Sequence, residues 1–311
     1  MSTANTKTVT KIYFPDGHLE KPVWDAMIKA GYKLKKSERG YHISVDHPNL
    51  ILKQVRPQIM PFYIMRGKGD GGFTGEDILE NSMLRYEKLE EKVVVVEKLP
   101  FRPTKLVVAV SEEIYPDVKS IEDLKEVVGD RELMFASEFP ELAKKYCVER
   151  GINAVVFDPI GKTEASILPP EPEADLILEV TEFGTTLREN RCRIIDVVKE
   201  TVHSVFIANK DSYANPEKRK IMENVITDIK EVVDSRNLIS FLFNVPDEKD
   251  IPRIIEFLTR EGFDPTVSKL AKGGVAIHII LDRARVKFLK PVIREMGGRR
   301  IATAPLIAFG E

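Results

Sequence analysis

A buried strand that breaks directly into a helix is the sequence feature that most limits how this chain can fold. The feature occupies residues 174–190, which read ADLILEVTEFGTTLREN. Its apolar residues 176–178 and Val180 predict a strand that carries the acid Glu179, and Gly184 permits the tight turn that follows. Thr185 and Thr186 then place hydroxyl groups beside the free N–H groups of a helix start, which suits an anion. Because many strands turn into helices in this way without a ligand, the stretch alone leaves phosphate binding as a hypothesis.

Strands and helices alternate on both sides of this stretch. Strands are predicted at 11–14, 42–45, 51–55, 93–97, 105–110, 133–136, 154–157, 194–198 and 204–208. Helices are predicted at 23–28, 61–66, 121–128, 138–150 and 216–233. This alternation is typical of an α/β fold with a mostly parallel sheet and helices on both faces. The glycine-dense segment 67–75 is either a ligand-binding turn or a crowded crossover, and crowded crossovers are the more common.

The last 75 residues, from Asn237 onward, follow a different order. Strands are predicted at 239–245, 266–270, 275–282 and 301–307, with helices at 250–261 and 284–296. The resulting βαββαβ order is that of a ferredoxin-like domain. Small modules of this type often pair and bind regulatory ligands, although a fold by itself does not establish a function.

Composition excludes several classes of function. The chain has 47 Lys and Arg against 49 Asp and Glu, a net charge of −2, which gives no general attraction to nucleic acid or an anionic membrane. No apolar run approaches the ~20 residues that span a bilayer, and the polar residues 1–9 predict no signal peptide. The two cysteines, Cys147 and Cys192, lack metal-ligand spacing, so we expect a reduced, cytoplasmic setting. The histidines are scattered, and no protein metal site is predicted: His18, His42, His47, His203 and His278.

Several segments carry, in order, a resemblance to one known family. They are Gly72–Gly75 with Asp77, Phe135–Pro140, Gly161 with Glu164, Ala174 with Asp175, Glu182–Asn190, Ile207–Asn209, and in the tail 244–246, 265–268 and 275–278. Over nearly the whole length, the chain resembles the long form of ATP phosphoribosyltransferase, the first enzyme of histidine biosynthesis. The segment EFGTTLREN at 182–190 is similar to the phosphate loop of that family.

The resemblance implies an architecture of three domains. Two α/β lobes, similar to a periplasmic binding protein, enclose the active site, and a ferredoxin-like (ACT-like) domain binds histidine as a feedback inhibitor. The implied bounds are lobe I at 1–103 and 187–214, lobe II at 104–186, a connecting helix at 215–236 and the regulatory domain at 237–311. Members of the long form are usually homo-hexamers, so we expect a homo-oligomer, either a hexamer or a dimer.

The resemblance also implies a reaction and its site residues. The enzyme is a glycosyltransferase that joins N1 of ATP to the anomeric carbon of phosphoribosyl pyrophosphate and releases pyrophosphate, with Mg²⁺ on the diphosphate. Contacts to phosphoribosyl pyrophosphate are expected from Glu179, Glu182, Gly184, Thr185, Thr186 and Leu187. Contacts to ATP are expected from Arg56, Gly75, Asp77, Glu164 and Asp175, with Lys68 and Lys162 as further candidate cations. Contacts to regulatory histidine are expected from Thr266, Ser268 and Gly274. No residue is assigned as a covalent nucleophile, because positioning and electrostatics supply most of the rate.

The chain departs from the family pattern at five positions. Asp16 and His18 replace a lysine and an arginine of the first loop, and Ile59 replaces an aspartate. Phe183 replaces a threonine of the phosphate loop, and Glu179 replaces an aspartate. Loss of cations weakens the binding of anionic substrates. These departures therefore leave two alternatives open: a non-catalytic ligand-binding or regulatory homologue, and a phosphoribosyltransferase with another acceptor.

Overall fold

The structure is a computed structural model that describes residues 8–36 and 40–310. Segment 1–7, for which we expect no signal peptide, lies outside the described residues. The chain divides into two compact units, one made of residues up to 25 with 32–226, the other of residues 26–31 with 227–311. Among the described helices, none is long and apolar enough to cross a bilayer.

The first unit is built on one mixed sheet of ten strands. The order across the sheet is β2 (Leu34–Lys36), β3 (His42–Val45), β4 (Leu50–Val55), β1 (Thr10–Pro15), β5 (Gly71–Gly75), β10 (Cys192–Asn209), β6 (Val93–Ser111), β9 (Leu176–Thr181), β7 (Leu133–Ser137) and β8 (Ala154–Phe157). Strands β4, β1 and β5 are parallel, as are β9, β7 and β8. The remaining neighbours are antiparallel, so the sheet consists of two parallel halves joined by antiparallel strands.

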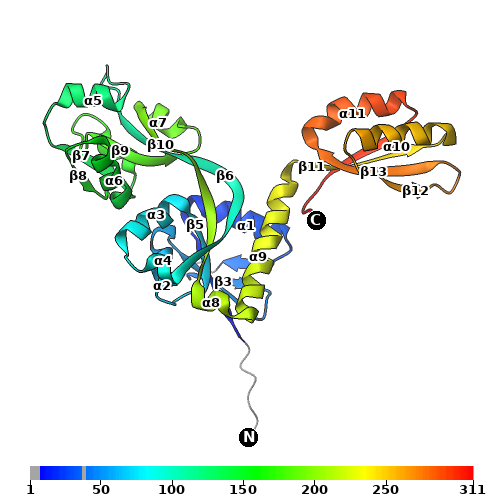
Figure 1. The fold of residues 1–311 in the computed structure, drawn as a ribbon, viewed down its shortest axis with the longest axis horizontal. Helices are drawn as coiled ribbons and strands as arrows, with labels where there is room; N and C mark the ends of the chain where they lie inside the picture. Colours follow the sequence, from blue (N-terminus) through cyan, green and yellow to red (C-terminus); the bar gives the residue numbers. More distant parts are fainter. Residues whose placement is uncertain (1–7, 37–39, 311) are drawn as a thin grey trace, which may run out of the picture. The chain divides into compact units, whose positions relative to one another are not determined.

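The joining strands β6 and β10 correct the sequence prediction, which divided each of them into two. Both are continuous, and Figure 1 shows them running from the elements around α2–α4 to those around α5–α7. Segment 100–104 contains two prolines, and for this reason the sequence predicted separate strands at 93–97 and 105–110. The strand continues through it because β10 absorbs the irregularity, with register shifts on either side of Val202. A bulged partner strand therefore replaces the expected turn.

Helices cover the sheet of the first unit, and α1, α2, α5, α6 and α9 lie where the sequence pattern predicted helices. They are η1 (Gly17–Leu19), α1 (Glu20–Lys29), η2 (Pro57–Ile59), α2 (Met60–Met65), α3 (Glu76–Arg85), α4 (Leu89–Lys92), α5 (Ile121–Val128), α6 (Pro140–Arg150), η3 (Thr163–Ile167), α7 (Thr185–Glu189), α8 (Lys210–Ala214) and α9 (Pro216–Asp234), with α9 running into the second unit. In β9, Leu176 and Leu178 pack with Phe135 on one face of the sheet. Ile177 packs with Leu187 of α7 on the opposite face. The alternation of β9 therefore places α7 on a defined side of the sheet.

Crowding explains the glycine-dense segment that ends in β5. A side chain at Gly69 would overlap the ring of Tyr13, and one at Gly72 would lie 2.5 Å from the sulfur of Met60. Gly71 is enclosed in the same way by Phe206. These glycines allow the neighbouring strands and side chains to approach closely, so their packing accounts for them without a ligand.

The second unit contains an antiparallel sheet of four strands with two helices. The order is β12 (Thr266–Lys269), β13 (Val275–Asp282), β11 (Leu238–Val245) and β14 (Arg299–Pro305), and the helices are α10 (Ile251–Arg260) and α11 (Arg283–Glu295), with short helices η4 (Ser235–Asn237) and η5 (Glu248–Asp250). Phe241 and Phe243 of β11 pack with Ile254, Leu258 and Ile293 of the two helices. This arrangement confirms the ferredoxin-like βαββαβ fold predicted from the sequence.

Candidate active site

The six parallel strands of the first unit end in loops that carry most of the predicted site residues. Strands β1, β4 and β5 end before Asp16, Arg56 and Glu76, and strands β7, β8 and β9 end before Glu138, Asp158 and Glu182. Ligands of open α/β sheets bind outside the carboxyl ends of the strands. The candidate site therefore lies where these two sets of loops approach each other.

A cleft of about 690 Å³ lies between loops of the two halves of the sheet. It is lined by Arg56, Gln58, Ile59, Asn81, Ser82, Arg85, Tyr86, Glu138, Pro140, Asp158, Ile160, Gly161 and Lys162. The amide of Gln58 donates a hydrogen bond of 3.3 Å to the carboxylate of Glu138 across it. Within residues 8–36 and 40–310, the charged groups of Arg56 and Lys162 have no hydrogen-bond or ion-pair partner. The cleft therefore offers these two cations to an anionic ligand, together with Arg85, whose guanidinium lies 5.5 Å from the centre of the Tyr86 ring.

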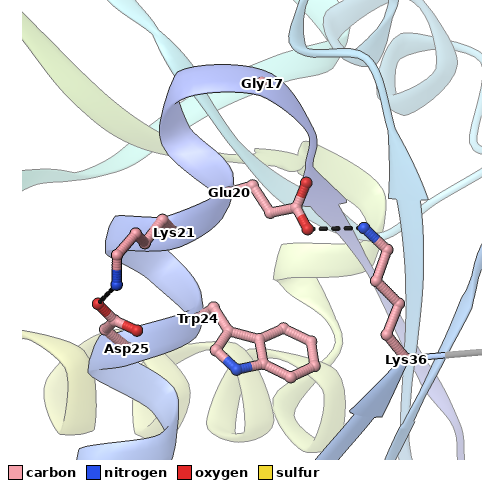
Figure 2. A pocket seen from close by; sticks show the side chains of 6 residues that line it. All are labelled: Gly17, Glu20, Lys21, Trp24, Asp25 and Lys36. Atoms are coloured by element: carbon pink, nitrogen blue, oxygen red, sulfur yellow. Dashed lines mark hydrogen bonds and ion pairs between the residues drawn. The ribbon is translucent and has the colours of Figure 1, made fainter.

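A second hollow, of about 400 Å³, lies beside α1 and differs in its charges. It is lined by Gly17, Glu20, Lys21, Trp24, Asp25 and Lys36 (Figure 2). Glu20 pairs with Lys36 at 2.7 Å, and Lys21 pairs with Asp25 at 2.5 Å. The four charged side chains thus neutralise one another around the indole of Trp24. We take the cleft, with its unpaired cations, as the candidate site.

The loop at the end of β9 has the predicted strand–turn–helix form. Gly184 adopts a left-handed conformation with φ of 65°, and its N–H donates a hydrogen bond of 2.8 Å to the hydroxyl of Thr181. The side chains of Thr185 and Thr186 are exposed, whereas Leu187 is buried in the core. Burial of Leu187 anchors the loop in the core. Because helix α7 has only five residues, its helix dipole is weak.

Glu179 lies on the face of β9 that α7 covers. It follows the buried Ile177 by two residues and pairs in the ladder with Val107, which belongs to the same core cluster. Burial raises the pKa of the Glu179 carboxyl to about 7, and the negative charges of Glu138 and Glu164 act in the same direction. The structure thus brings Glu164 close to Glu179, and Glu179 titrates near neutral pH.

Gly75 and Asp77 form a closed helix start at the end of β5. Asp77 is 5% exposed, and burial raises the pKa of its carboxyl, while the charge of His18 partly opposes that shift. A side chain at Gly75 would overlap the carboxylate of Asp77. The acid therefore folds back over the first turn of α3, where the helix dipole favours a negative charge.

Comparison with known proteins identifies the family. The family model of ATP phosphoribosyltransferase matches residues 56–231, more than half of the chain. The chain belongs to the ATP phosphoribosyltransferase family. A protein named ATP phosphoribosyltransferase from Archaeoglobus fulgidus is 67% identical over 82% of this chain and 90% of its own length. A protein named ATP phosphoribosyltransferase from Chlorobaculum parvum is 32% identical over 96% of this chain and 96% of its own length. This match over nearly the full length identifies the long form of the family.

Solved structures support the fold of this family member. A chain of the ATP phosphoribosyl transferase (HisG:HisZ) complex from Thermotoga maritima has a TM-score of 0.57 at 23% identity, covering 73% of this chain and 99% of that one. Protein AF1704 from Archaeoglobus fulgidus has a TM-score of 0.50 at 10% identity and covers 84% of both chains. At these identities the similarity concerns the fold alone.

Two residues predicted for the site lie at the opposite edge of the sheet. Asp175 precedes β9, and its carboxylate accepts hydrogen bonds from Tyr115 at 2.6 Å, Arg131 at 2.8 Å and the N–H of Met134 at 2.8 Å. Burial raises the pKa of Asp175, but these hydrogen bonds outweigh burial and hold it below its usual value. Lys68 precedes β5 in the same way. The structure does not bring either residue to the cleft.

Sequence reasoning missed the residue that joins α3 to α6. The side-chain oxygen of Asn81 in α3 accepts hydrogen bonds from the N–H groups of Glu141 at 2.9 Å and Leu142 at 3.2 Å. Helix α6 begins at Pro140, and the preceding Phe139 has no side chain that can cap it. The absence of a local cap was a signal that a partner from elsewhere satisfies these groups.

The residues predicted to bind histidine lie on the edge of the second unit's sheet. Thr266 and Ser268 pair with His278 and Ala276, and all of β12 is exposed. Gly274 has φ of 76°, and a side chain there would overlap the backbone of Val245. Thr266 and Ser268 share a face of β12, since they are two residues apart, and Gly274 closes the turn into β13.

Proposed function

We propose that this chain transfers the phosphoribosyl group of phosphoribosyl pyrophosphate to N1 of ATP and releases pyrophosphate, the first step of histidine biosynthesis. The single observation that carries the proposal is the 67% identity to the ATP phosphoribosyltransferase of Archaeoglobus fulgidus. The strand–turn–helix form of the loop at 184–187 and the cleft with its unpaired cations support it. We expect the enzyme to act in the cytoplasm.

The loop after β9 is the proposed site of phosphoribosyl pyrophosphate. The N–H groups of Thr185–Leu187 and the hydroxyls of Thr185 and Thr186 bind the 5′-phosphate, Gly184 lets the phosphate approach the backbone closely, and Glu182 borders the same loop. Glu179 contacts the ribose hydroxyls from the adjacent strand. With a pKa of about 7, its carboxyl can accept a hydrogen bond when ionised and donate one when protonated.

The cleft is the proposed site of ATP. Arg56 and Lys162 reach it from opposite halves of the sheet, and their unpaired charges suit the triphosphate. Glu164 borders the ribose site through its proximity to Glu179. Gly75 and Asp77 support the first turn of α3, from which Asn81 and Arg85 reach the cleft. We leave Asp175 out of the ATP contacts because three donors of the chain occupy its carboxylate.

Mg²⁺ is the proposed divalent cation of the reaction. Carboxylates suit this ion, and Glu138 and Glu164 supply them beside Glu179. Among the described residues, no three His, Cys, Asp or Glu side chains converge in a cage, so most ligands would come from the diphosphate oxygens. When bound, the ion neutralises charge that develops on the leaving diphosphate. Arg56 and Lys162 orient the anionic substrates around that charge.

The part of the second unit at 237–311 is the proposed regulatory domain. Thr266, Ser268 and Gly274 are the proposed contacts to histidine, and the protein is a homo-oligomer, either a hexamer or a dimer. Removal of residues 237–311 should leave the first unit soluble and active but insensitive to histidine. Equal inhibition of the full-length and shortened proteins by histidine would contradict this assignment, as would failure of the full-length protein to bind histidine.

A turnover assay tests the main proposal. Pyrophosphate release should require ATP, phosphoribosyl pyrophosphate and Mg²⁺ together, and the product should carry the ribosyl group on N1 of the adenine. Binding of both substrates without release would favour a non-catalytic homologue. Binding of phosphoribosyl pyrophosphate without any affinity for ATP would favour another acceptor.

A further inference from the structure

Arg102 lies where strand β6 passes from one half of the sheet to the other. Residues 100–103 have no partner in β10, although Leu99 pairs with Ser204 and Thr104 with Val202. The strand therefore carries an exposed arginine at an interruption of its ladder. The position lies just beyond the end of β9, since Lys105 pairs with Thr181, the last residue of that strand.

The guanidinium of Arg102 contacts the two residues that precede the glycine of the phosphate loop. Its Nη1 lies 3.4 Å from the carboxylate of Glu182, and its central carbon lies 5.1 Å from the centre of the Phe183 ring. Phe183 is 61% exposed, so it does not act as a core residue. Its ring instead makes a cation–π contact with the guanidinium of Arg102.

Both contacts of Arg102 are weak enough to be exchanged for a stronger partner. The side chain of Arg102 is 65% exposed and that of Glu182 is 46% exposed, and ion pairs at such positions contribute little stability. The guanidinium has five N–H donors, of which the contact with Glu182 uses one. A phosphate group that accepts two parallel hydrogen bonds is a better partner than one exposed carboxylate.

Several acids lie around the phosphate loop, so a cation such as Arg102 would favour the binding of an anionic substrate there. Glu164, Glu179 and Glu182 are acids of this neighbourhood, and Arg188 faces the loop through a 3.5 Å contact with the hydroxyl of Thr185. The loop after β1 carries Asp16 and His18 and adds no fixed positive charge. Arginines close to the loop would therefore add to the positive charge that Arg56 and Lys162 offer a substrate with several phosphate groups.

We propose that Arg102 is a substrate-binding residue that donates paired hydrogen bonds to a phosphate group of phosphoribosyl pyrophosphate, with Phe183 and Glu182 holding it ready. The inference rests on the proposed function and adds a contact from strand β6 to it. On binding, the guanidinium turns from Glu182 to the phosphate while it stays stacked on Phe183. The chemistry is shared by the 5′-phosphate and the diphosphate of the substrate.

Calorimetric titration of the full-length protein with phosphoribosyl pyrophosphate tests the role of Arg102. We expect Arg102→Ala to weaken binding roughly 10- to 100-fold, the range of a lost charge-assisted hydrogen-bond pair, and Arg102→Lys to restore part of the loss. Lys105→Ala is the matched control. This lysine lies on the same strand, and its 2.5 Å ion pair with Glu200 is also exposed to solvent. It should change affinity by less than about twofold.

Two further measurements separate a direct contact from a structural effect. Titration with ribose 5-phosphate and with inorganic pyrophosphate shows which phosphate Arg102 binds, because only the probe that uses the arginine should lose affinity in Arg102→Ala. The slope of affinity against salt concentration should also become shallower in that variant, since one cation is missing. In steady-state assays the KM for phosphoribosyl pyrophosphate should rise while the KM for ATP stays constant.

The outcomes distinguish this inference from the proposed function. If the unaltered protein binds phosphoribosyl pyrophosphate and Arg102→Ala binds it equally well, the role of Arg102 is wrong and the proposed function stands. If the unaltered protein does not bind phosphoribosyl pyrophosphate, the proposed function fails and the role of Arg102 fails with it. Arg102→Gln keeps the length and packing of the side chain, so a loss of affinity shared by Gln and Ala but not by Lys assigns the effect to charge.

Discussion

Each half of the ten-stranded sheet contains a turn in which a strand passes through a glycine into a helix, and the two turns differ in whether the helix start is open to a ligand. In the first half, β5 ends at Gly75 and α3 begins with Glu76 and Asp77. In the second half, β9 ends before Gly184, and α7 begins with Thr185 and Thr186. Both are strand–glycine–helix turns at the carboxyl edge of the sheet. The difference is which group occupies the helix start.

Asp77 fills the start of helix α3, whereas Thr185 and Thr186 leave the start of helix α7 open to a ligand. Asp77 is buried against the start of α3 and fills the space beside Gly75. Thr185 and Thr186 are exposed, and their loop carries no acid inside the turn. A helix start that is filled by its own buried carboxyl group leaves no room for an anion beside the same N–H groups. We therefore expect phosphate at Gly184 and a structural role for Gly75.

Substitution of Gly75 and Gly184 should give the largest difference between the two turns. Gly184→Val should weaken the binding of phosphoribosyl pyrophosphate by more than about 100-fold while the fold remains intact, because a β-branched residue is strained at φ of 65° and obstructs the phosphate. Gly75→Val should instead lower the melting temperature, because its side chain would overlap Asp77. Calorimetry and circular dichroism measure both. A folded Gly184→Val protein with unchanged affinity would contradict the phosphate loop.

The pH dependence of stability sharpens the comparison at Glu179. The pKa of this carboxyl rises from 4.5 to about 7 on folding, so the folded state favours the protonated form. Relative to Glu179→Gln, the unaltered protein should have its full stability below pH 4.5. It should lose roughly 3 kcal/mol of unfolding free energy as the pH rises to about 8. Urea titrations at pH 5 and pH 8 measure this change, and a pH-independent difference between the two proteins would refute the elevated pKa.

The first loop allows a test of charge at the other half of the sheet. Asp16 is half-buried with no cap hydrogen bond from its side chain, and His18 is exposed. Asp16→Lys with His18→Arg should tighten ATP or phosphoribosyl pyrophosphate binding about five- to tenfold at low salt, and less at moderate salt because of screening. Initial rates and titrations at two salt concentrations measure the gain. No gain in either quantity would favour the non-catalytic homologue.

The smallest expected effect concerns the link between the two halves. Asn81→Ala removes the acceptor for the N–H groups of Glu141 and Leu142 and should lower stability by about 1 kcal/mol, as the loss of a helix cap does. Ser120→Ala removes the local cap of α5 and is the matched control. If Asn81 serves only as a cap, the two variants should lose similar stability and keep similar substrate affinity.

Much of this protein could be predicted from local sequence patterns. The apolar run at 176–180 and the turn at Gly184 predicted β9, the loop and α7, because their residues interact with near neighbours in the chain. The βαββαβ order of the C-terminal residues was predicted for the same reason. The family followed from short segments in order along the chain, and comparison with known proteins confirms it.

Only the tertiary structure decided which of these residues lie together. It placed Asp175 and the loop at Gly184 at opposite ends of β9, because a six-residue strand places its two ends at opposite edges of the sheet. It joined Asn81 to α6 across 60 residues and brought Arg102 to Phe183. It also made β6 and β10 continuous, since pairing with a bulged neighbour overrides a local break. Local pattern specifies elements, whereas pairing and burial between distant segments specify the site.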